Sequence, residues 1–245
     1  MIIGICGPAG SGKDTAGEYL VKNHGFVRVA LADPLKRICK EVFNFSDEQL
    51  WGPSEMRNKP DERYPRPDFV TVGPAFSGPG GLPMHRILPN PPGPWLTPRH
   101  ALQQLGTEWG RNCYENVWVD YALRIARELL VPIDDFPGDI ASYDPKQGIE
   151  HKYLRGNRAK GVVITDVRFR NEVEAIKKAG GYVLRIERPG AGLTGAAGAH
   201  ASESEMREIP DDIFDARIDN NGTLKHLYTQ MGAALEALHQ KEQGK

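Results

Sequence analysis

Two glycines and a lysine near the N-terminus have the spacing of a phosphate-binding loop. In the segment IIGICGPAGSGKDT, Gly7, Gly12 and Lys13 match the first seven positions of the pattern GxxxxGK[ST]. A short apolar run precedes the loop and a helical segment follows it, which is the context that the motif requires. Glycines let backbone amides turn toward an anion, and the lysine can reach nucleotide phosphates. We expect phosphate binding by Gly10, Ser11, Gly12, Lys13, Asp14 and Thr15.

The eighth position of this loop departs from the pattern. Asp14 stands where Ser or Thr usually binds magnesium, and the hydroxyl follows one residue later, at Thr15. Asp14 could act on Mg²⁺ through water, orient an acceptor phosphate, or only complement the dipole of a first helical turn. Nucleoside monophosphate kinases resemble this arrangement, because in their GKGT motif the hydroxyl is displaced in the same way.

A second set of charged residues follows another buried strand. The run VVITD ends at Asp166, and Arg168, Arg170 and Glu172 come directly after it. Ligands of open parallel sheets bind at the carboxyl ends of the strands, so we expect these side chains to share a crevice with the phosphate loop. Asp166 is the candidate for holding magnesium through water, Arg168 for bridging phosphates and Arg170 for binding an acceptor. Glu172 is open to a catalytic or a capping interpretation.

Further candidates could bind an anionic or aromatic acceptor. Positive charge opposite the phosphate loop would hold the acceptor and neutralise the transferring phosphoryl group. Gln103 could hydrogen-bond a base edge, and Glu108 a sugar hydroxyl or a base amino group. Trp118 could stack on a base, although filling the core is the ordinary role of a tryptophan. The full set is Lys36, Arg63, Arg99, Gln103, Glu108 and Trp118.

Composition excludes several classes of function. The chain has 245 residues and a formal net charge of −1, with 32 acidic and 31 basic residues. We therefore expect no binding to a nucleic-acid polymer, which needs a broad positive field. Cys6, Cys39 and Cys113 lie far apart, which argues against a disulfide framework or a zinc site and favours a reducing cytoplasm. No segment approaches the roughly 20 apolar residues of a membrane span, so neither secretion nor membrane insertion is expected.

Alternating apolar runs and amphipathic segments predict an α/β fold with a parallel sheet covered by helices on both faces. Expected strands are 2–6, 26–31, 161–166, 182–188 and one beginning at 216, and expected helices are 15–23, 34–43, one capped by Thr97, 117–130, 171–179 and a final one from 224. Residues 72–98 are rich in Pro and Gly and predict a surface excursion. Residues 132–160 are also expected to form loops.

Seven blocks, in order, resemble the bacteriophage deoxynucleoside monophosphate kinase family, a branch of the P-loop nucleoside monophosphate kinases. They are GPAGSGKDT, LADPLK, TPRHALQQLGTE followed by NVWVD, VITDVRFRNE, AGGYVLRIERPG, HASE and DNNGTL, and they cover most of the chain. The resemblance implies a single P-loop NTPase-type kinase domain over 1–245. Within it, 45–116 would be an inserted acceptor-binding region and 189–212 a segment resembling a lid.

The activity implied by the resemblance is transfer of the γ-phosphoryl group of ATP to a deoxynucleoside monophosphate, with Mg²⁺. The family pattern places Lys13, Asp14 and Thr15 on ATP and magnesium, Lys36 and Arg99 near the acceptor phosphate, Arg63, Gln103 and Trp118 around the acceptor base, and Asp166, Arg168 and Glu172 in the catalytic crevice. Arg57 could take the place of Arg63. The DNNGT segment would lie beside the ATP adenine.

Two other functions stay open on the sequence. One is a P-loop kinase of another small acceptor such as dephospho-coenzyme A, whose family is similar near NNGTL. The other is a regulatory protein that binds ATP without turnover, against which Asp166 and Arg168 opposite Lys13 argue. A homodimer is the expectation from general frequency alone. If the chain is encoded by a phage, the compartment would be the host cytoplasm.

Overall fold

The computed structural model describes residues 1–65, 95–130, 139–153, 159–192 and 201–244. These residues divide into two compact units. The first unit comprises Met1–Arg37 and Leu105–Lys245, and the second comprises Ile38–Gln104. Among the described helices, none is both long and apolar enough to cross a membrane.

The first unit contains a five-stranded parallel sheet in the order β2-β7-β1-β8-β9. Its strands are β1 (Ile2–Cys6), β2 (Phe26–Val29), β7 (Gly161–Val167), β8 (Tyr182–Glu187) and β9 (Ala216–Asp219). The central strand β1 is buried along its whole length and pairs with β7 on one side and β8 on the other. Apolar runs of this kind suit strands that are covered on both faces. The expected parallel sheet is confirmed.

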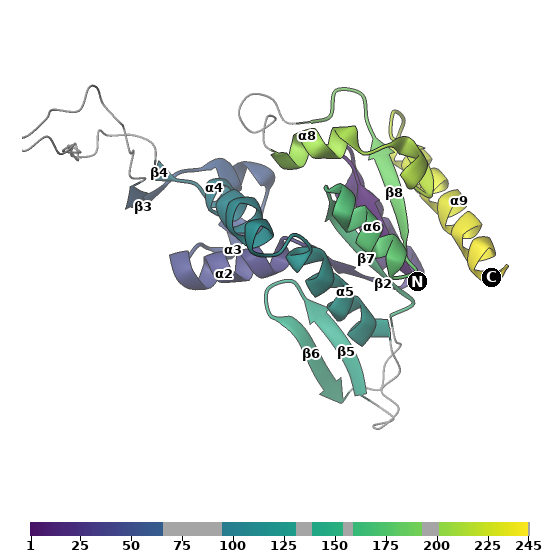
Figure 1. Cartoon of the computed structure of the whole chain (residues 1–245), viewed down its shortest axis with the longest axis horizontal. Helices are drawn as coiled ribbons and strands as arrows, with labels where there is room; N and C mark the ends of the chain where they lie inside the picture. The colour runs from purple at the N-terminus through teal and green to yellow at the C-terminus, as the bar shows by residue number, and fades with distance from the viewer. Residues whose placement is uncertain (66–94, 131–138, 154–158, 193–200, 245) are drawn as a thin grey trace, which may run out of the picture. The chain divides into compact units, whose positions relative to one another are not determined.

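Helices cover both faces of this sheet (Figure 1). Helix α1 (Lys13–His24) packs against β1, β2 and β7 and contacts α9 (Leu224–Gln243). On the other face, α5 (Val117–Leu130) and α6 (Arg170–Lys178) contact one another as well as strands of the sheet. The core between α1, α9 and the sheet includes Ile5, Leu20, Leu184 and Met231. This layered α/β arrangement is the predicted one.

An antiparallel hairpin lies where the sequence predicted only loops. Strands β5 (Asp139–Asp144) and β6 (Gly148–Tyr153) pair throughout, so the expectation for 132–160 was wrong for these residues. Gly148 has a φ of 99°, and the Asp144 carboxylate accepts two backbone amides of the turn. The strands were missed because their sequences, DIASYD and GIEHKY, contain no apolar run.

The second unit is built from short elements. They are the end of α2 (Asp33–Phe43), α3 (Asp47–Trp51), η1 (Ser54–Asn58), β3 (Asp61–Pro65), β4 (Trp95–Leu96) and α4 (Pro98–Gln103). Phe43, Phe45 and Tyr64 form an aromatic cluster, in which the two phenylalanine rings stack and the tyrosine ring meets both edge-on. Strand β4 pairs with β3 and lies inside the stretch 72–98 expected as an excursion, whereas 66–94 are outside the described residues.

Helix α4 begins as the sequence predicts. The Thr97 hydroxyl accepts the amide of His100, which caps the helix. A π-helical segment, η2 (Gln104–Arg111), follows directly. Near the C-terminus, α8 (Ala201–Glu208) and the short η3 (Asp211–Ile213) precede β9.

Two helices of the structure carry apolar residues that are partly exposed. In α2, Leu35 and Cys39 are buried, but Ile38 is 38% exposed and Val42 66% exposed. In α9, Leu224 is 55% exposed, because it is the first residue of the helix and lies one turn before Leu227, where the core contact begins.

Candidate functional site

The phosphate loop between β1 and α1 exposes unused hydrogen-bond donors. Gly10 and Gly12 have φ values of 78° and 96°, a left-handed conformation that glycine adopts without strain. Gly12 precedes α1 and no side chain caps this helix, so the amides of its first turn have no capping acceptor. The buried Ser11 hydroxyl has no hydrogen-bond partner within the described part of the chain. A helix N-terminus with these free donors is suited to binding an anion.

The loop is held in place from two distant segments. The Asn220 side chain, which is 8% exposed, donates from Nδ2 to the Ser11 carbonyl at 2.8 Å. The Gly192 amide donates to the Ala9 carbonyl at 2.9 Å. A Cβ at Gly12 would lie 2.3 Å from the Asn220 Nδ2 atom, so this position also requires glycine sterically. The role of Asn220 was not predicted, although it lies in the DNNGT block.

Charged residues gather near the end of β1. Burial raises the pKa of the Cys6 thiol to about 12, and the thiol also feels the charges of Arg185, Glu172, Arg168 and Lys13. The side chain of Lys13 is only 8% exposed. The structure therefore brings together three predicted residues, Lys13, Arg168 and Glu172, and adds Arg185, which the sequence did not single out.

Asp166 makes contacts that the sequence did not predict. Its carboxylate oxygens accept the backbone amides of Leu31 at 2.8 Å and Ala32 at 3.0 Å, in the loop that follows β2. Each carboxylate oxygen can accept more than one hydrogen bond, so a water ligand of a metal can still bind there. Asp166 thus fixes a neighbouring loop whether or not it also acts on a metal.

Magnesium is implied by the family resemblance, and the residues present fit it. Within the residues described, no group of three or more His, Cys, Asp or Glu side chains could hold a metal ion. Mg²⁺ needs no such cage, because it keeps several waters and usually binds one or two protein oxygens together with nucleotide phosphates. The Thr15 hydroxyl in the first turn of α1 and the half-buried Asp166 carboxylate provide oxygens of this kind.

Glu172 is buried and caps the turn before α6. It is 4% exposed, and its Oε2 atom accepts the amides of Arg168 at 2.8 Å and Phe169 at 3.1 Å. Burial raises the pKa of Glu172 to about 7, against the opposing effect of these two amides and of Arg111. The capping interpretation is confirmed by these bonds, and the cap shapes the turn that carries Arg168.

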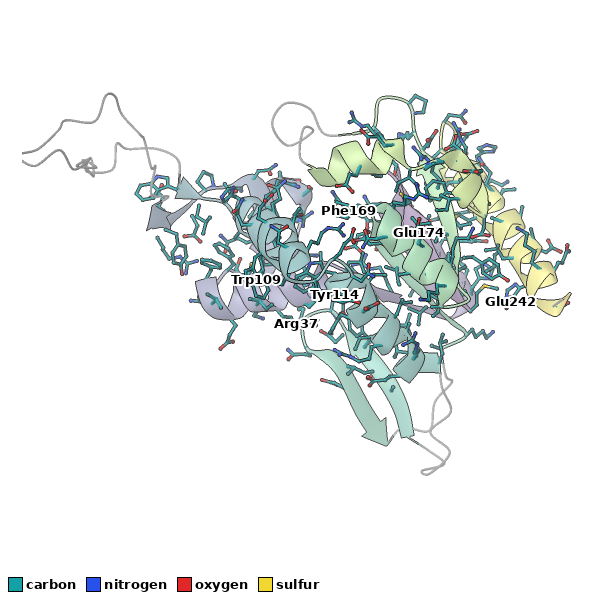
Figure 2. The ribbon with its side chains drawn as sticks, viewed as in Figure 1. Arg37, Trp109, Tyr114, Phe169, Glu174 and Glu242 are labelled. Atoms are coloured by element: carbon teal, nitrogen blue, oxygen red, sulfur yellow. The ribbon has the colours of Figure 1, made fainter. Side chains whose placement is uncertain are left out.

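Arg111 is a neighbour of this cap that sequence reasoning missed. Its side chain is 11% exposed, and its guanidinium lies 3.6 Å from the centroid of the Phe169 ring. It also lies 3.8 Å from Glu172 Oε1 and donates to the Asn171 side chain at 3.1 Å. Figure 2 labels Phe169, which lies directly before α6. Nothing in the sequence distinguishes Arg111 from an ordinary surface charge.

A cavity of about 370 Å³ adjoins the phosphate loop. Gly7 and Pro8 of the loop line it, together with residues that follow β8 and residues of α8 and β9. Two of the lining residues, Arg188 and Arg207, are exposed, and their guanidinium groups form no hydrogen bond or ion pair with any residue that the structure describes. They are basic groups available to a ligand, and the sequence did not assign them.

Two predicted site residues of the first unit take other partners. Arg170 donates to Glu174 at 2.7 Å, and this pair lies on the exposed surface of α6, where Figure 2 labels Glu174. Trp118 is 9% exposed and donates from its indole to the Gly106 carbonyl at 2.8 Å. The structure thus favours a core role for Trp118. Glu108 is exposed on η2.

In the second unit, Arg63 is paired with a buried carboxylate. It binds Asp61 through Nε at 2.8 Å and through its terminal nitrogen at 2.6 Å. This guanidinium holds the pKa of Asp61 well below its usual range. Arg57, the alternative to Arg63, donates to the carbonyls of Leu50 and Gly52 at the end of α3.

The other second-unit candidates lie on α4. Arg99 donates to the Asn58 side chain and, at 2.8 Å, to the Ser54 hydroxyl. Gln103 is the last residue of α4 and is half-buried. The predicted acceptor residues are therefore divided, with Arg63, Arg99 and Gln103 in the second unit and Lys36, Glu108, Trp118 and Arg170 in the first.

Fold and site together define a parallel α/β protein with a glycine-rich loop at a helix N-terminus that is suited to binding an anion. No protein-family model matches the chain. It is 32% identical over 234 residues to a protein of Acanthamoeba polyphaga mimivirus named "Putative deoxynucleotide monophosphate kinase", and the alignment covers 94% of each chain. The chain belongs to the deoxynucleotide monophosphate kinase family. The relative comes from a giant virus, so the expected restriction to bacteriophages has no support.

Proposed function

We propose that the protein transfers the γ-phosphoryl group of ATP to a deoxynucleoside monophosphate, giving ADP and the deoxynucleoside diphosphate. The observation that carries this proposal is the glycine-rich loop before α1, a helix that no side chain caps, with a buried Ser11 hydroxyl that has no hydrogen-bond partner within the described residues. The chain is also related over 94% of its length to a protein named "Putative deoxynucleotide monophosphate kinase". Such a loop binds phosphate, and the relative's name supplies the acceptor class.

On the donor side, the loop amides and Lys13 would hold the β and γ phosphates. Arg188 and Arg207 line the adjoining cavity and would bind further phosphate oxygens, because their guanidinium groups have no partner among the described residues. Arg168 follows the capped turn and would bridge the phosphates during transfer. Catalysis of phosphoryl transfer depends mainly on such positioning and charge stabilisation.

Thr15 and Asp166 would hold Mg²⁺, with Asp166 acting through water. The ion supplies neutralisation of phosphate charge when it is bound. The Asp14 side chain is 67% exposed, and its Oδ2 lies 3.9 Å from Lys13 Nζ. On the acceptor side, Lys36 of the first unit would bind the monophosphate.

The test is ADP release from ATP and Mg²⁺ with each deoxynucleoside monophosphate, each ribonucleotide and dephospho-coenzyme A as separate acceptors. We expect stimulation by at least one deoxynucleoside monophosphate. If no monophosphate raises ADP release above the background, the proposal fails. Stimulation by dephospho-coenzyme A alone would replace the acceptor, and ATP binding without any turnover would indicate a regulatory protein.

Two substitutions connect this activity to the site. Lys13→Ala and Arg168→Ala should abolish transfer while the circular dichroism spectrum stays unchanged. Lys22→Ala is the matched control, because Lys22 lies on the same helix as Lys13 and its side chain is 71% exposed. Normal turnover in either site variant would remove that residue from the mechanism.

A further inference from the structure

Asp33 is a buried carboxylate with one oxygen directed at a predicted substrate-binding residue. Its side chain is fully buried at the start of α2. The Oδ2 atom accepts the Ala30 amide and the Tyr143 hydroxyl, each at 3.1 Å. The Oδ1 atom has no hydrogen bond within the described residues, and it lies 4.0 Å from Lys36 Nζ. The lysine side chain is 14% exposed.

The hairpin β5–β6 supplies the tyrosine that holds Asp33. Arg37 lies beside this hairpin (Figure 2) and donates to the Pro145 carbonyl at 2.9 Å and to the Tyr121 hydroxyl. The same guanidinium lies 3.4 Å from the Tyr143 hydroxyl. These contacts join α2, α5 and the turn of the hairpin, so Tyr143 has a fixed position relative to Asp33.

A buried carboxylate of this kind is costly unless its charge is compensated. Removing an ion from water costs several kcal/mol, and the cost is offset only by hydrogen bonds and an opposite charge. Oδ2 has two hydrogen bonds, whereas the ion-pair partner of Oδ1 is the Lys36 ammonium. Burial raises the pKa of Asp33, and the Lys36 charge opposes this rise. The Lys36 ammonium is therefore the main cation that compensates this carboxylate, and Arg28 makes a smaller contribution.

We propose that Asp33 is a positioning residue: it holds the Lys36 ammonium in the orientation that binds the acceptor phosphate, and Tyr143 of the β5–β6 hairpin fixes Asp33. This inference rests on the proposed function, which places Lys36 at that phosphate. It assigns a role to the hairpin, for which the sequence predicted only loops. Asp33 itself touches neither substrate in this arrangement.

The test is a double-mutant cycle of Asp33→Asn and Lys36→Met, read as the KM for the deoxynucleoside monophosphate. Asparagine keeps a carbonyl oxygen for the Ala30 amide and the Tyr143 hydroxyl, and it replaces the charged oxygen that faces Lys36 by an uncharged amino group. Each single variant should raise this KM about tenfold, the effect of losing about 1.4 kcal/mol of binding, and leave the KM for ATP unchanged. In the Lys36→Met background, Asp33→Asn should raise the acceptor KM by less than about twofold, because the effects of substitutions at two coupled residues do not add.

A Tyr143→Phe variant keeps the inference testable if Asp33→Asn does not fold. Loss of the hydroxyl should raise the acceptor KM about threefold, since it removes one hydrogen bond to Asp33. The matched control is Ser142→Ala on the same strand, whose hydroxyl bonds the Glu150 carbonyl instead and should leave this KM unchanged.

The outcomes separate this inference from the proposed function. If the unaltered protein phosphorylates no deoxynucleoside monophosphate, the inference falls together with the proposed function. If it does phosphorylate one, two results would overturn only the positioning role of Asp33. The first is an acceptor KM of Asp33→Asn within twofold of that of the unaltered protein. The second is a double variant in which Asp33→Asn raises the acceptor KM by its full single-variant factor on top of the Lys36→Met effect. An equal rise in the KM for ATP would indicate a general structural role and would also overturn it.

Discussion

Replacing Glu172 by glutamine should change how the stability of the protein depends on pH. Burial raises the pKa of this carboxyl from its usual 4.5 to about 7, so the folded state holds the proton more tightly than the unfolded state does. The contribution of this protonated carboxyl to the free energy of unfolding is fully present below about pH 4 and is lost as the pH rises through about 7. One pKa unit corresponds to about 1.4 kcal/mol, so the loss from this group is about 3 kcal/mol between about pH 4 and about pH 8.

Glutamine has no ionisable carboxyl group at this position, so the variant loses this pH dependence. Its carbonyl oxygen can still accept the amides of Arg168 and Phe169, while its amino group faces Arg111 unfavourably. We expect Glu172→Gln to be less stable than the unaltered protein at about pH 5, with the difference shrinking by about 2 to 3 kcal/mol by about pH 8.

The assay is urea unfolding of both proteins across this pH range, because subtracting the two curves removes the titration of all other groups. Glu174→Gln is the matched control on the same helix, since the Glu174 side chain is 53% exposed. The control difference should stay within about 0.5 kcal/mol at every pH. A pH-independent difference for Glu172→Gln would show that Glu172 is not held as a buried acid, and would refute the reasoning.

Three further predictions test the loop and the core. Gly12→Ala should destabilise the protein by about 1 to 3 kcal/mol and abolish ATP binding in equilibrium dialysis. The reason is that Gly12 has a φ of 96° and that an added Cβ atom would lie 2.3 Å from Asn220 Nδ2. Unchanged ATP binding would contradict this loop geometry. Alkylation of the native protein should label Cys113, which is exposed, and spare Cys6, which is buried, as read by mass spectrometry. Trp118→Phe should cost about 1 kcal/mol in urea unfolding through its lost hydrogen bond and leave the KM for the deoxynucleoside monophosphate unchanged. A raised KM for this acceptor would restore a role of Trp118 in binding its base.

The central strands could be predicted because their signal is local. Strands β1, β7 and β8 are short apolar runs bounded by glycine, proline or charged residues, and each was expected within about a residue of its observed bounds. The order of the strands could not be predicted in this way. β1 pairs with both β7 and β8, so the sheet places the first strand of the chain between two strands that follow one another in sequence.

The predictable part of the site is the part that a motif encodes. The loop glycines and Lys13 are fixed by a spacing of a few residues, and the turn after β7 brings Arg168 and Glu172 to the same strand end. The contacts that hold this site join residues far apart in sequence. Asn220 reaches Ser11 across 209 positions, and a single sequence carries no signal for such a pair.

The acidic residues of the first unit explain how an anion site can be built in a chain of net charge −1. Three carboxylates, Asp33, Asp166 and Glu172, accept backbone amides of the loops beside the predicted site. A carboxylate that faced phosphate would repel it, whereas one bound to amides uses its charge to fix a turn. One of the segments fixed in this way leads into α2, which carries Lys36, and the other carries Arg168. The acids therefore position the two cationic side chains that would meet phosphate. Neutralising one of these acids should therefore weaken substrate binding rather than strengthen it, although it makes the local charge more positive.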